Sequence, residues 1–281
     1  MVIKECIATA VSILDKSGIE NPLLDSRVLL GKVIAKPDVF LIVNSDYEVS
    51  QKEKDSFFSL VERRSKGEPL AYITGEKEFM SISFSVNPSV LIPRPDTEHL
   101  AELAIDLCDK NGYKNIADFC TGSGALAISV AINCPDVKVT GYDISPSALD
   151  VAEYNRKSHK AVNVRFEILD VLSELDSIDD KYDMVMSNPP YISGEEMTKL
   201  DKTVGEFEPH LALYGGDDGL DFYRVISSRA VSFLAKGGIL AFEVGHTQAI
   251  AVKEIMSVNF CNIQIKKDYA GIERVVWGKL K

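Results

Sequence analysis

The stretch that decides the fold is Tyr182-Asp183-Met184-Val185-Met186-Ser187-Asn188-Pro189-Pro190-Tyr191. Its first half is short and mostly apolar, which is typical of a buried strand. The two consecutive prolines end that strand, because neither has an N–H to donate to a sheet and each fixes its own φ. An amide, a rigid double proline and an aromatic ring therefore stand at the end of a core strand, where open α/β sheets bind their ligands.

The four residues after this strand suit a planar NH₂ group. Asn188 has a carbonyl that can accept a hydrogen bond from an N–H, and the stiff proline backbone can direct a second carbonyl at the same nitrogen. Tyr191 can lie flat against a planar group. An adenine, a cytosine or a glutamine side chain would fit, whereas a simple turn is an equal alternative for the tetrapeptide taken alone.

Composition places the chain among ordinary globular proteins. Its 281 residues are 46% hydrophobic and 26% charged, which leaves room for two domains. No apolar run reaches membrane-spanning length and the N-terminus lacks a signal-peptide pattern, so we expect no membrane partner. The five cysteines are scattered, without Cys-x-x-Cys spacing, and the four histidines show no ligand spacing, so we expect a reducing cytoplasm and no metal site. The net charge of −11 disfavours nucleic acid as a partner.

The periodicity of the chain divides it into three parts. Residues 1–73 show helical spacing and predict a small helical domain, which either recognises a substrate or merely covers the core. Residues 74–95 alternate and then become proline-rich, which predicts a β-hairpin linker. Residues 96–281 alternate strands with helices, which predicts a mostly parallel sheet with helices on both faces and an antiparallel strand at the edge.

The expected strands of the third part lie near residues 115–119, 137–142, 163–168, 182–187, 238–244, 262–267 and 272–278. Its expected helices lie near residues 124–133, 146–158, 219–235 and 247–257.

Three further turns follow predicted strands. The glycines of the loop at 120–124 would let the backbone approach a ligand at a helix start, but their Gly-x-Gly spacing gives little support to a dinucleotide or P-loop site. Asp143 ends the second strand, where a carboxylate can accept both hydroxyls of a ribose or can cap the next helix. Asp170 follows the third strand and could reach an adenine amino group or cap a turn.

The order of these features resembles the Rossmann-like S-adenosyl-L-methionine-dependent methyltransferases that modify amino groups. A closer resemblance, covering about Arg64 to Val276, is to the HemK/PrmC-type protein-(glutamine-N5) methyltransferases that act on peptide chain release factors. The stretches that carry it are Arg-Ser-Lys-Gly-Glu-Pro-Leu-Ala-Tyr-Ile-Thr-Gly at 64–75, Glu-Phe at 78–79, Val-Leu-Ile-Pro-Arg-Pro-Asp-Thr-Glu at 90–98 and Glu-Phe-Glu-Pro-His-Leu-Ala-Leu-Tyr-Gly-Gly-Asp-Asp-Gly-Leu at 206–220.

The resemblance implies a class I methyltransferase sheet, S-adenosyl-L-methionine as cofactor and a release factor as protein partner. It implies methylation of a glutamine side-chain nitrogen in the Gly-Gly-Gln loop of that partner, which modulates translation termination. The implied catalytic residues are Asn188, Pro189, Pro190 and Tyr191. The implied cofactor-binding residues are Cys120, Thr121, Gly122, Ser123, Gly124, Asp143, Ile144, Asp170, Val171 and Asn188.

The chain departs from the family pattern at a few positions. Cys120 stands where the family usually has glycine, Met80-Ser81 replaces an aromatic–glycine pair in the hairpin, and Asp96 stands where glutamate is commoner. Cys120 belongs to the implied cofactor loop, but none of these departures touches the implied catalytic residues. An adenine-N6 DNA methyltransferase is an alternative interpretation, because it presents the same planar amino group to a similar tetrapeptide, and a non-catalytic adenosylmethionine-binding module is another.

Overall fold

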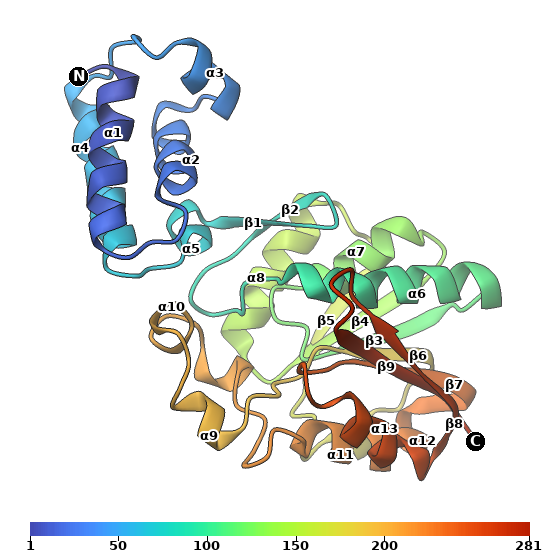
Figure 1. Ribbon diagram of the computed structural model, residues 1–281. Coiled ribbons are helices and arrows are strands. Elements are labelled where there is room, and N and C mark those ends of the chain that lie inside the picture. The colour runs from blue at the N-terminus through green and yellow to red at the C-terminus, as the bar shows by residue number, and fades with distance from the viewer. The chain divides into compact units, whose positions relative to one another are not determined.

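The computed structural model describes residues 1–281, which separate into two compact units (Figure 1). The helical unit comprises Met1–Gly75 together with Asp201–Phe207, and the sheet unit comprises Glu76–Leu200 together with Glu208–Lys281. A short segment from late in the chain thus belongs to the unit that the N-terminal residues build. No helix in either unit is both long and apolar enough to cross a membrane.

Apolar side chains at helical spacing hold the helical unit together. The buried residues of its first helix recur every three or four positions and so form one stripe: Ile3, Cys6, Ala10 and Leu14. The sequence Ser-Gln-Lys-Glu at 50–53 is a capping-box pattern, and it opens another helix: the Glu53 N–H donates to Ser50 Oγ (3.3 Å) and the Ser50 N–H donates to Glu53 Oε2 (2.9 Å). The helices are α1 (Ile3–Lys16), α2 (Pro22–Ile34), α3 (Asp38–Val43), α4 (Gln51–Ser65), α5 (Leu70–Thr74) and α10 (Lys202–Gly205).

The sheet unit contains seven strands in the order β5-β4-β3-β6-β7-β9-β8. The five strands from β5 to β7 are parallel to one another, whereas β9 pairs antiparallel with both β7 and β8. The expected class is therefore confirmed, with β8 outermost and the reversed strand β9 inserted beside β7. The strands are β3 (Asn115–Phe119), β4 (Lys138–Asp143), β5 (Val164–Ile168), β6 (Tyr182–Ser187), β7 (Leu234–Glu243), β8 (Phe260–Lys267) and β9 (Glu273–Leu280).

Helices cover both faces of this sheet, α6, α7 and α8 on one face and α11, α12 and α13 on the other (Figure 1). The prediction of a single helix over 219–235 is wrong. This region forms two helices, α11 and α12, and β7 already begins at Leu234. The helices are α6 (Glu98–Asn111), α7 (Ala125–Asn133), α8 (Pro146–Ser158), α9 (Gly194–Met197), α11 (Asp221–Ser228), α12 (Ala230–Phe233) and α13 (Ala249–Ser257).

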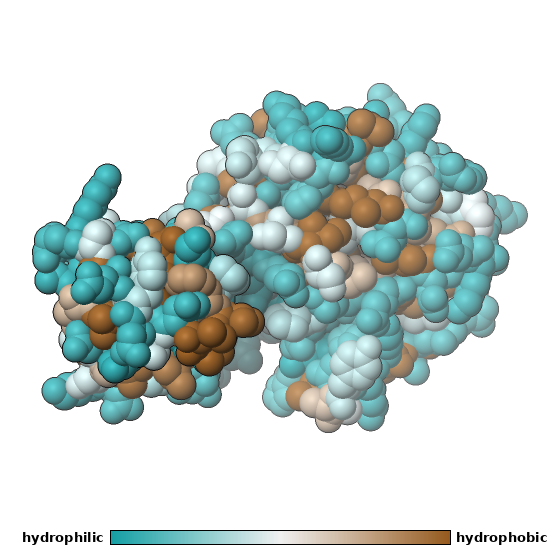
Figure 2. All heavy atoms as spheres, turned by 90° about the horizontal axis from the view of Figure 1, so that it is seen from above, coloured by the Kyte–Doolittle hydropathy of each residue, from teal (hydrophilic) through white to brown (hydrophobic).

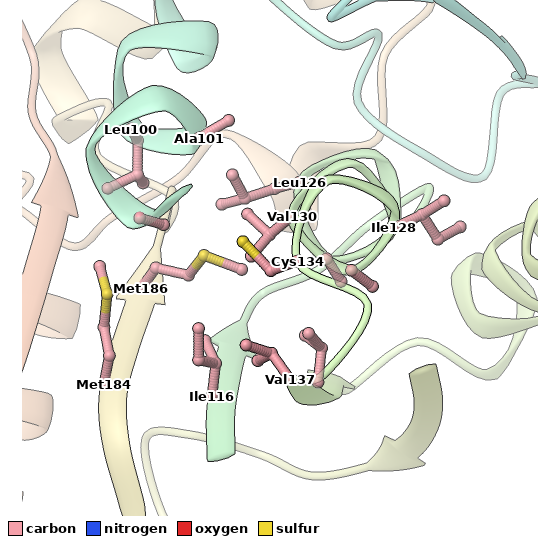
Figure 3. Packing of buried hydrophobic residues seen from close by; sticks show 14 of the residues in the cluster. Leu100, Ala101, Ile116, Leu126, Ile128, Val130, Cys134, Val137, Met184 and Met186 are labelled. Carbon is pink, nitrogen blue, oxygen red and sulfur yellow. The ribbon is translucent and has the colours of Figure 1, made fainter. Parts of the chain in front are cut away.

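The two faces of β6 belong to two separate apolar cores. Met184 and Met186 point to the face covered by α6 and α7, where they meet Leu100, Leu126 and Val130 (Figure 3). Val185 points to the other face and joins the cluster that includes residues of α11 and α13. This alternation, fully buried on both sides, explains why the strand reads as a continuous apolar run.

A β-hairpin with a two-residue loop precedes the sheet and contains β1 (Glu76–Phe79) and β2 (Ile82–Ser85). Its loop residues, Met80 and Ser81, have φ of 51° and 60°. Two consecutive left-handed residues are the signature of the type I′ turn, which strongly favours Asn and Gly because a side chain is strained there. The departure of this pair from the family pattern is therefore a departure at positions that carry backbone strain.

We expect Ser81→Gly to stabilise the protein, because Ser81 is exposed and the left-handed conformation costs glycine nothing. The left-handed penalty is about 1–2 kcal/mol and the entropy that glycine adds to the unfolded chain is about 0.5–1 kcal/mol, so the net gain is about 0.5–1 kcal/mol. Urea unfolding measures it. The matched control is Ser83→Gly, at an exposed position of β2 with ordinary φ, which should destabilise; a similar loss for Ser81→Gly would contradict the strain argument.

Candidate functional site

Four parallel strands end together at one edge of the sheet. Phe119, the last residue of β3, pairs with Tyr142 of β4 and with Ser187 of β6. A cavity of about 310 Å³ lies at this edge. The predicted site residues that line it are Cys120, Gly122, Asp143, Ile144, Asp170, Val171, Asn188 and Pro190. The predicted residues Thr121, Ser123, Gly124, Pro189 and Tyr191 lie outside its lining.

The loop between β3 and α7 owes its shape to three left-handed residues, Cys120, Gly122 and Gly124, with φ of 61°, 55° and 76°. A Cβ on Gly124 would lie 2.7 Å from the Phe166 ring, whereas one on Gly122 would meet nothing within 4 Å. Gly124 is therefore required by packing, and Gly122 by its conformation. Cys120 adopts a conformation that glycine adopts without strain, which accounts for the usual glycine at this position.

Thr121 and Ser123 are buried and hold the loop from below. Thr121 Oγ1 donates to Asp118 Oδ2 (2.6 Å), and the Ser123 carbonyl accepts from Asn155 Nδ2 (2.9 Å). Asp118 is completely enclosed, and burial raises the pKa of its carboxyl to about 7 although the Thr121 hydrogen bond opposes the shift. These contacts position the loop without reaching the cavity themselves.

Asp143 joins the loop to the end of the second strand. Its Oδ2 accepts from the Gly122 N–H (2.9 Å) and its Oδ1 from the Ser145 N–H (2.9 Å), while burial raises the pKa of the carboxyl. The N-cap of α8 is Ser145, whose Oγ accepts from the Ala148 N–H (3.2 Å). Ser145, and not Asp143, is therefore the N-cap residue of α8, and Asp143 lines the cavity.

Asp170 uses both carboxylate oxygens within its own turn. Oδ1 accepts from the Leu172 N–H (2.9 Å) and Oδ2 from Ser173 Oγ (2.7 Å). The turn-capping alternative is thus present in the structure, at a residue that also lines the cavity. The next residue, Val171, is buried, whereas Ile144, which directly follows the neighbouring strand β4, is about half exposed.

Asn188 lines the cavity and directly follows β6. Its Nδ2 donates to Thr97 Oγ1 (3.1 Å), a residue in the short 3₁₀ turn Pro95–Thr97. Below it, Ser187 Oγ donates to the Phe119 carbonyl (2.7 Å) and ties β6 to β3 at their ends. The amide is therefore anchored on its nitrogen side and half-buried rather than free in solvent.

The backbone of Tyr191 is held by a hydrogen bond from Gln248. Its carbonyl accepts from Gln248 Nε2 (2.9 Å), and Gln248 Oε1 in turn accepts from the Gly245 N–H (3.0 Å). Burial raises the pKa of the Tyr191 hydroxyl to about 12. The ring packs against the apolar cluster that contains residues of α11 and α13, so it stands beside the cavity rather than in its wall.

A buried carboxylate fastens the outer wall of the cavity. Glu208, whose side chain is 1% exposed, accepts from the Ile92 N–H (3.2 Å) and from Arg94 Nη2 (2.5 Å). It thereby joins the proline-rich segment to the segment that contributes Pro209 and Leu211 to the wall. Sequence reasoning missed the roles of Thr97, Glu208 and Gln248, although Thr97 and Glu208 fall within stretches that carry the family resemblance.

Known proteins resemble this chain in sequence and in fold. Residues 5–75 match the family described as PrmC N-terminal domain, and residues 99–207 match the methyltransferase small domain. A release factor glutamine methyltransferase of Clostridium acetobutylicum is 41% identical over 98% of this chain and 98% of its own. One of Moorella thermoacetica is 40% identical over 98% of this chain and 97% of its own.

A solved structure supports the fold alone. The crystal structure of a methyltransferase from Pyrococcus furiosus has a TM-score of 0.51 and 16% identity, covering 72% of this chain and 91% of that chain. The full-length sequence relatives carry the assignment further, because their identity extends over both the helical unit and the sheet unit. The chain therefore belongs to the release factor glutamine methyltransferase family.

Proposed function

We propose that this protein transfers a methyl group from S-adenosyl-L-methionine to the side-chain amide nitrogen of a glutamine in a peptide chain release factor. The observation that carries the proposal is the cavity itself, which brings Asn188 together with Gly122 and Asp143 at one edge of the sheet. The names of the full-length relatives supply the protein substrate. The five free cysteines and a substrate from translation favour the cytoplasm as the place of action.

The residues around the cavity fit the cofactor. A volume of about 310 Å³ suits a small molecule. The space beside Gly122 is open, and the Asp143 carboxylate, held by backbone N–H groups of Gly122, Ile144 and Ser145, lines the cavity. We assign cofactor binding to residues that line the cavity, namely Cys120, Gly122, Asp143, Ile144, Asp170, Val171 and Asn188, and to Thr121, Ser123 and Gly124, which shape the glycine loop. When bound, S-adenosyl-L-methionine supplies an electrophilic methyl group.

The chain's own residues overcome the low nucleophilicity of an amide nitrogen, whose lone pair is delocalised into its carbonyl. In the proposed complex, Asn188 Oδ1 and the Pro189 carbonyl each accept one N–H of the substrate glutamine, while Pro190 keeps the turn rigid. Tyr191 packs on the amide plane and excludes water. Placement can contribute about 7–11 kcal/mol to lowering a barrier, and the two acceptors stabilise positive charge that develops on the nitrogen.

We assign recognition of the release factor to the helical domain, residues 1–73. Hydrophobic residues gather on the surface of the helical unit, at the left of the view in Figure 2. Two adjacent helices, α2 and α3, supply most of them: Leu23, Leu24, Val28, Val39, Ile42 and Val43. Exposed apolar groups concentrated in this way are typical of a protein-binding surface.

The proposed reaction predicts a mass gain of one methyl group on a glutamine of a release factor incubated with this protein and the cofactor. Asn188→Ala should lower catalytic efficiency at least about a hundredfold, because it removes one of only two acceptors for the substrate NH₂. Asn188→Asp keeps an acceptor and should retain some activity. Peptide mass spectrometry of the release factor measures how much methylation the wild type and each of the two variants produce.

Other outcomes identify the alternatives. Methylation of duplex DNA in place of the release factor would identify an adenine methyltransferase, and cofactor binding without any transfer would identify a binding module. If Asn188→Ala methylated glutamine at the wild-type rate, the tetrapeptide would not be the active site.

Asp143→Ala should weaken S-adenosyl-L-methionine binding. Loss of hydrogen bonds to a charged group costs about 1.5–3 kcal/mol, which corresponds to roughly a tenfold to hundredfold higher Kd. Isothermal calorimetry measures the change. The matched control is Asp150→Ala, which removes an exposed carboxylate of α8 outside the cavity lining and should leave the affinity unchanged. Equal affinities for both variants would reduce Asp143 to a residue that shapes the loop.

Val43→Glu should raise the KM for the release factor about tenfold or more, because it places a charge in the apolar surface of α2 and α3. Val43 is 74% exposed, so the fold should persist. The matched control is Val258→Glu, at a position of 73% exposure in the sheet unit, which should leave this KM unchanged. Wild-type kinetics for Val43→Glu would show that the helical domain only covers the core.

A further inference from the structure

A buried carboxyl group lies close to the tetrapeptide at 188–191 and takes no part in the reaction as proposed. Glu243 is the last residue of β7, one position beyond the pairing of Phe242 with Ser187 of β6. The residue is 2% exposed, and its Oε2 makes no hydrogen bond. The Thr97 side chain lies within hydrogen-bonding reach of this carboxyl. A carboxyl group this enclosed calls for an explanation, because burying a charge is unfavourable unless the charge is paired and hydrogen-bonded.

Thr97 connects this carboxyl group to Asn188. It is itself buried, and its Oγ1 accepts from Asn188 Nδ2 (3.1 Å). A hydroxyl has one proton, and an ionised carboxylate can only accept. While Glu243 is ionised, the Thr97 proton goes to that carboxylate, so that Thr97 can only accept from Asn188. The amide must in consequence present its NH₂ to Thr97 and direct its oxygen elsewhere.

We propose that Glu243 and Thr97 are positioning residues that set the orientation of the Asn188 side chain, so that Oδ1 remains available to an N–H of the substrate. The inference rests on the proposed function for its catalytic consequence. Without the network, the amide could turn over and present NH₂ to NH₂, which forms no hydrogen bond. Thr97 and Glu243 touch neither substrate nor cofactor in this scheme and act only through Asn188.

The protonation state of Glu243 decides whether this orientation is enforced. Burial raises the pKa of its carboxyl to about 7, with the Thr97 hydrogen bond opposing the shift. The other groups that face it are the Asp96 carboxylate, which also raises the pKa, the cations Arg274 and Arg94, which lower it, and the phenols of Tyr191 and Tyr223. Below about pH 7 the protonated carboxyl can donate, and the direction of the network is no longer fixed. Turnover should therefore fall as the pH drops through this value.

The kinetic test uses the full-length enzyme with a release factor as substrate. Thr97→Val removes the hydroxyl and should lower kcat roughly tenfold to hundredfold, as for other small misplacements of a reacting group, with little change in the KM for the cofactor. Thr97→Ser restores the hydroxyl and should restore most of kcat. Thr140→Val, the same replacement at a buried site in β4, is the matched control and should have no effect. A wild-type kcat for Thr97→Val would overturn the proposal.

Glu243→Gln tests the direction of the network, since an amide can donate as well as accept. It should lower kcat and abolish the fall in turnover below about pH 7. An acid limb that persisted unchanged in this variant would overturn the role of Glu243, because the titrating group would then lie elsewhere.

A spectroscopic test separates this inference from the proposed function. In ¹⁵N-labelled protein, the Asn188 side-chain NH₂ signals are assigned by their absence in Asn188→Ala and followed from about pH 5 to about pH 9. They should shift with an apparent pKa near 7 in the wild type and stay constant in Thr97→Val and Glu243→Gln. That result in an enzyme unable to methylate a release factor would refute the function and keep the network. If the Asn188 NH₂ signals of the wild type did not change with pH, the network would be refuted.

Discussion

The parallel register of β3 with its two neighbours is the constraint on which the candidate site depends. Because Phe119 pairs with both Tyr142 and Ser187, the glycine loop, Asp143 and Asn188 all emerge at one edge of the sheet. A slip of one residue would move β6 by about 3.3 Å and exchange the faces of its side chains, so that its two apolar cores would be lost. Core packing on both faces thus secures the position of Asn188.

Buried carboxyl groups then position the segments that follow the strands. Asp118, Glu208 and Glu243 are each almost completely enclosed. Asp118 accepts from the Thr121 hydroxyl in the loop after its own strand, whereas Glu208 accepts from Ile92 and Arg94, and Glu243 lies next to Thr97, in segments far away in the chain. Enclosed groups of this kind are costly unless satisfied, and once satisfied they allow few alternative arrangements. The loops around the cavity are therefore held from behind by polar contacts, whereas the cavity wall itself remains available to ligands.

Several features followed from the sequence because their causes are local. The capping box at Ser50, the stop imposed by Pro189 and Pro190, and the alternation of strands with helices depend on residues close together in the chain. The helices α3 and α5 have six and five residues, too few to show a period, and sequence reasoning missed them. The break between α11 and α12 was missed for a related reason, since no proline or glycine marks it.

The sequence by itself determined the class of sheet, the order of its strands along the chain and the tetrapeptide at the end of β6. Only the tertiary structure decided which side chains support that tetrapeptide. Asn188 meets Thr97 across 91 positions, and Ile92 meets Glu208 across 116. Such contacts leave no periodic trace in the chain, because they arise from the packing of whole elements rather than from the preferences of neighbouring residues. The direction in which the Asn188 amide faces is therefore a property of the fold.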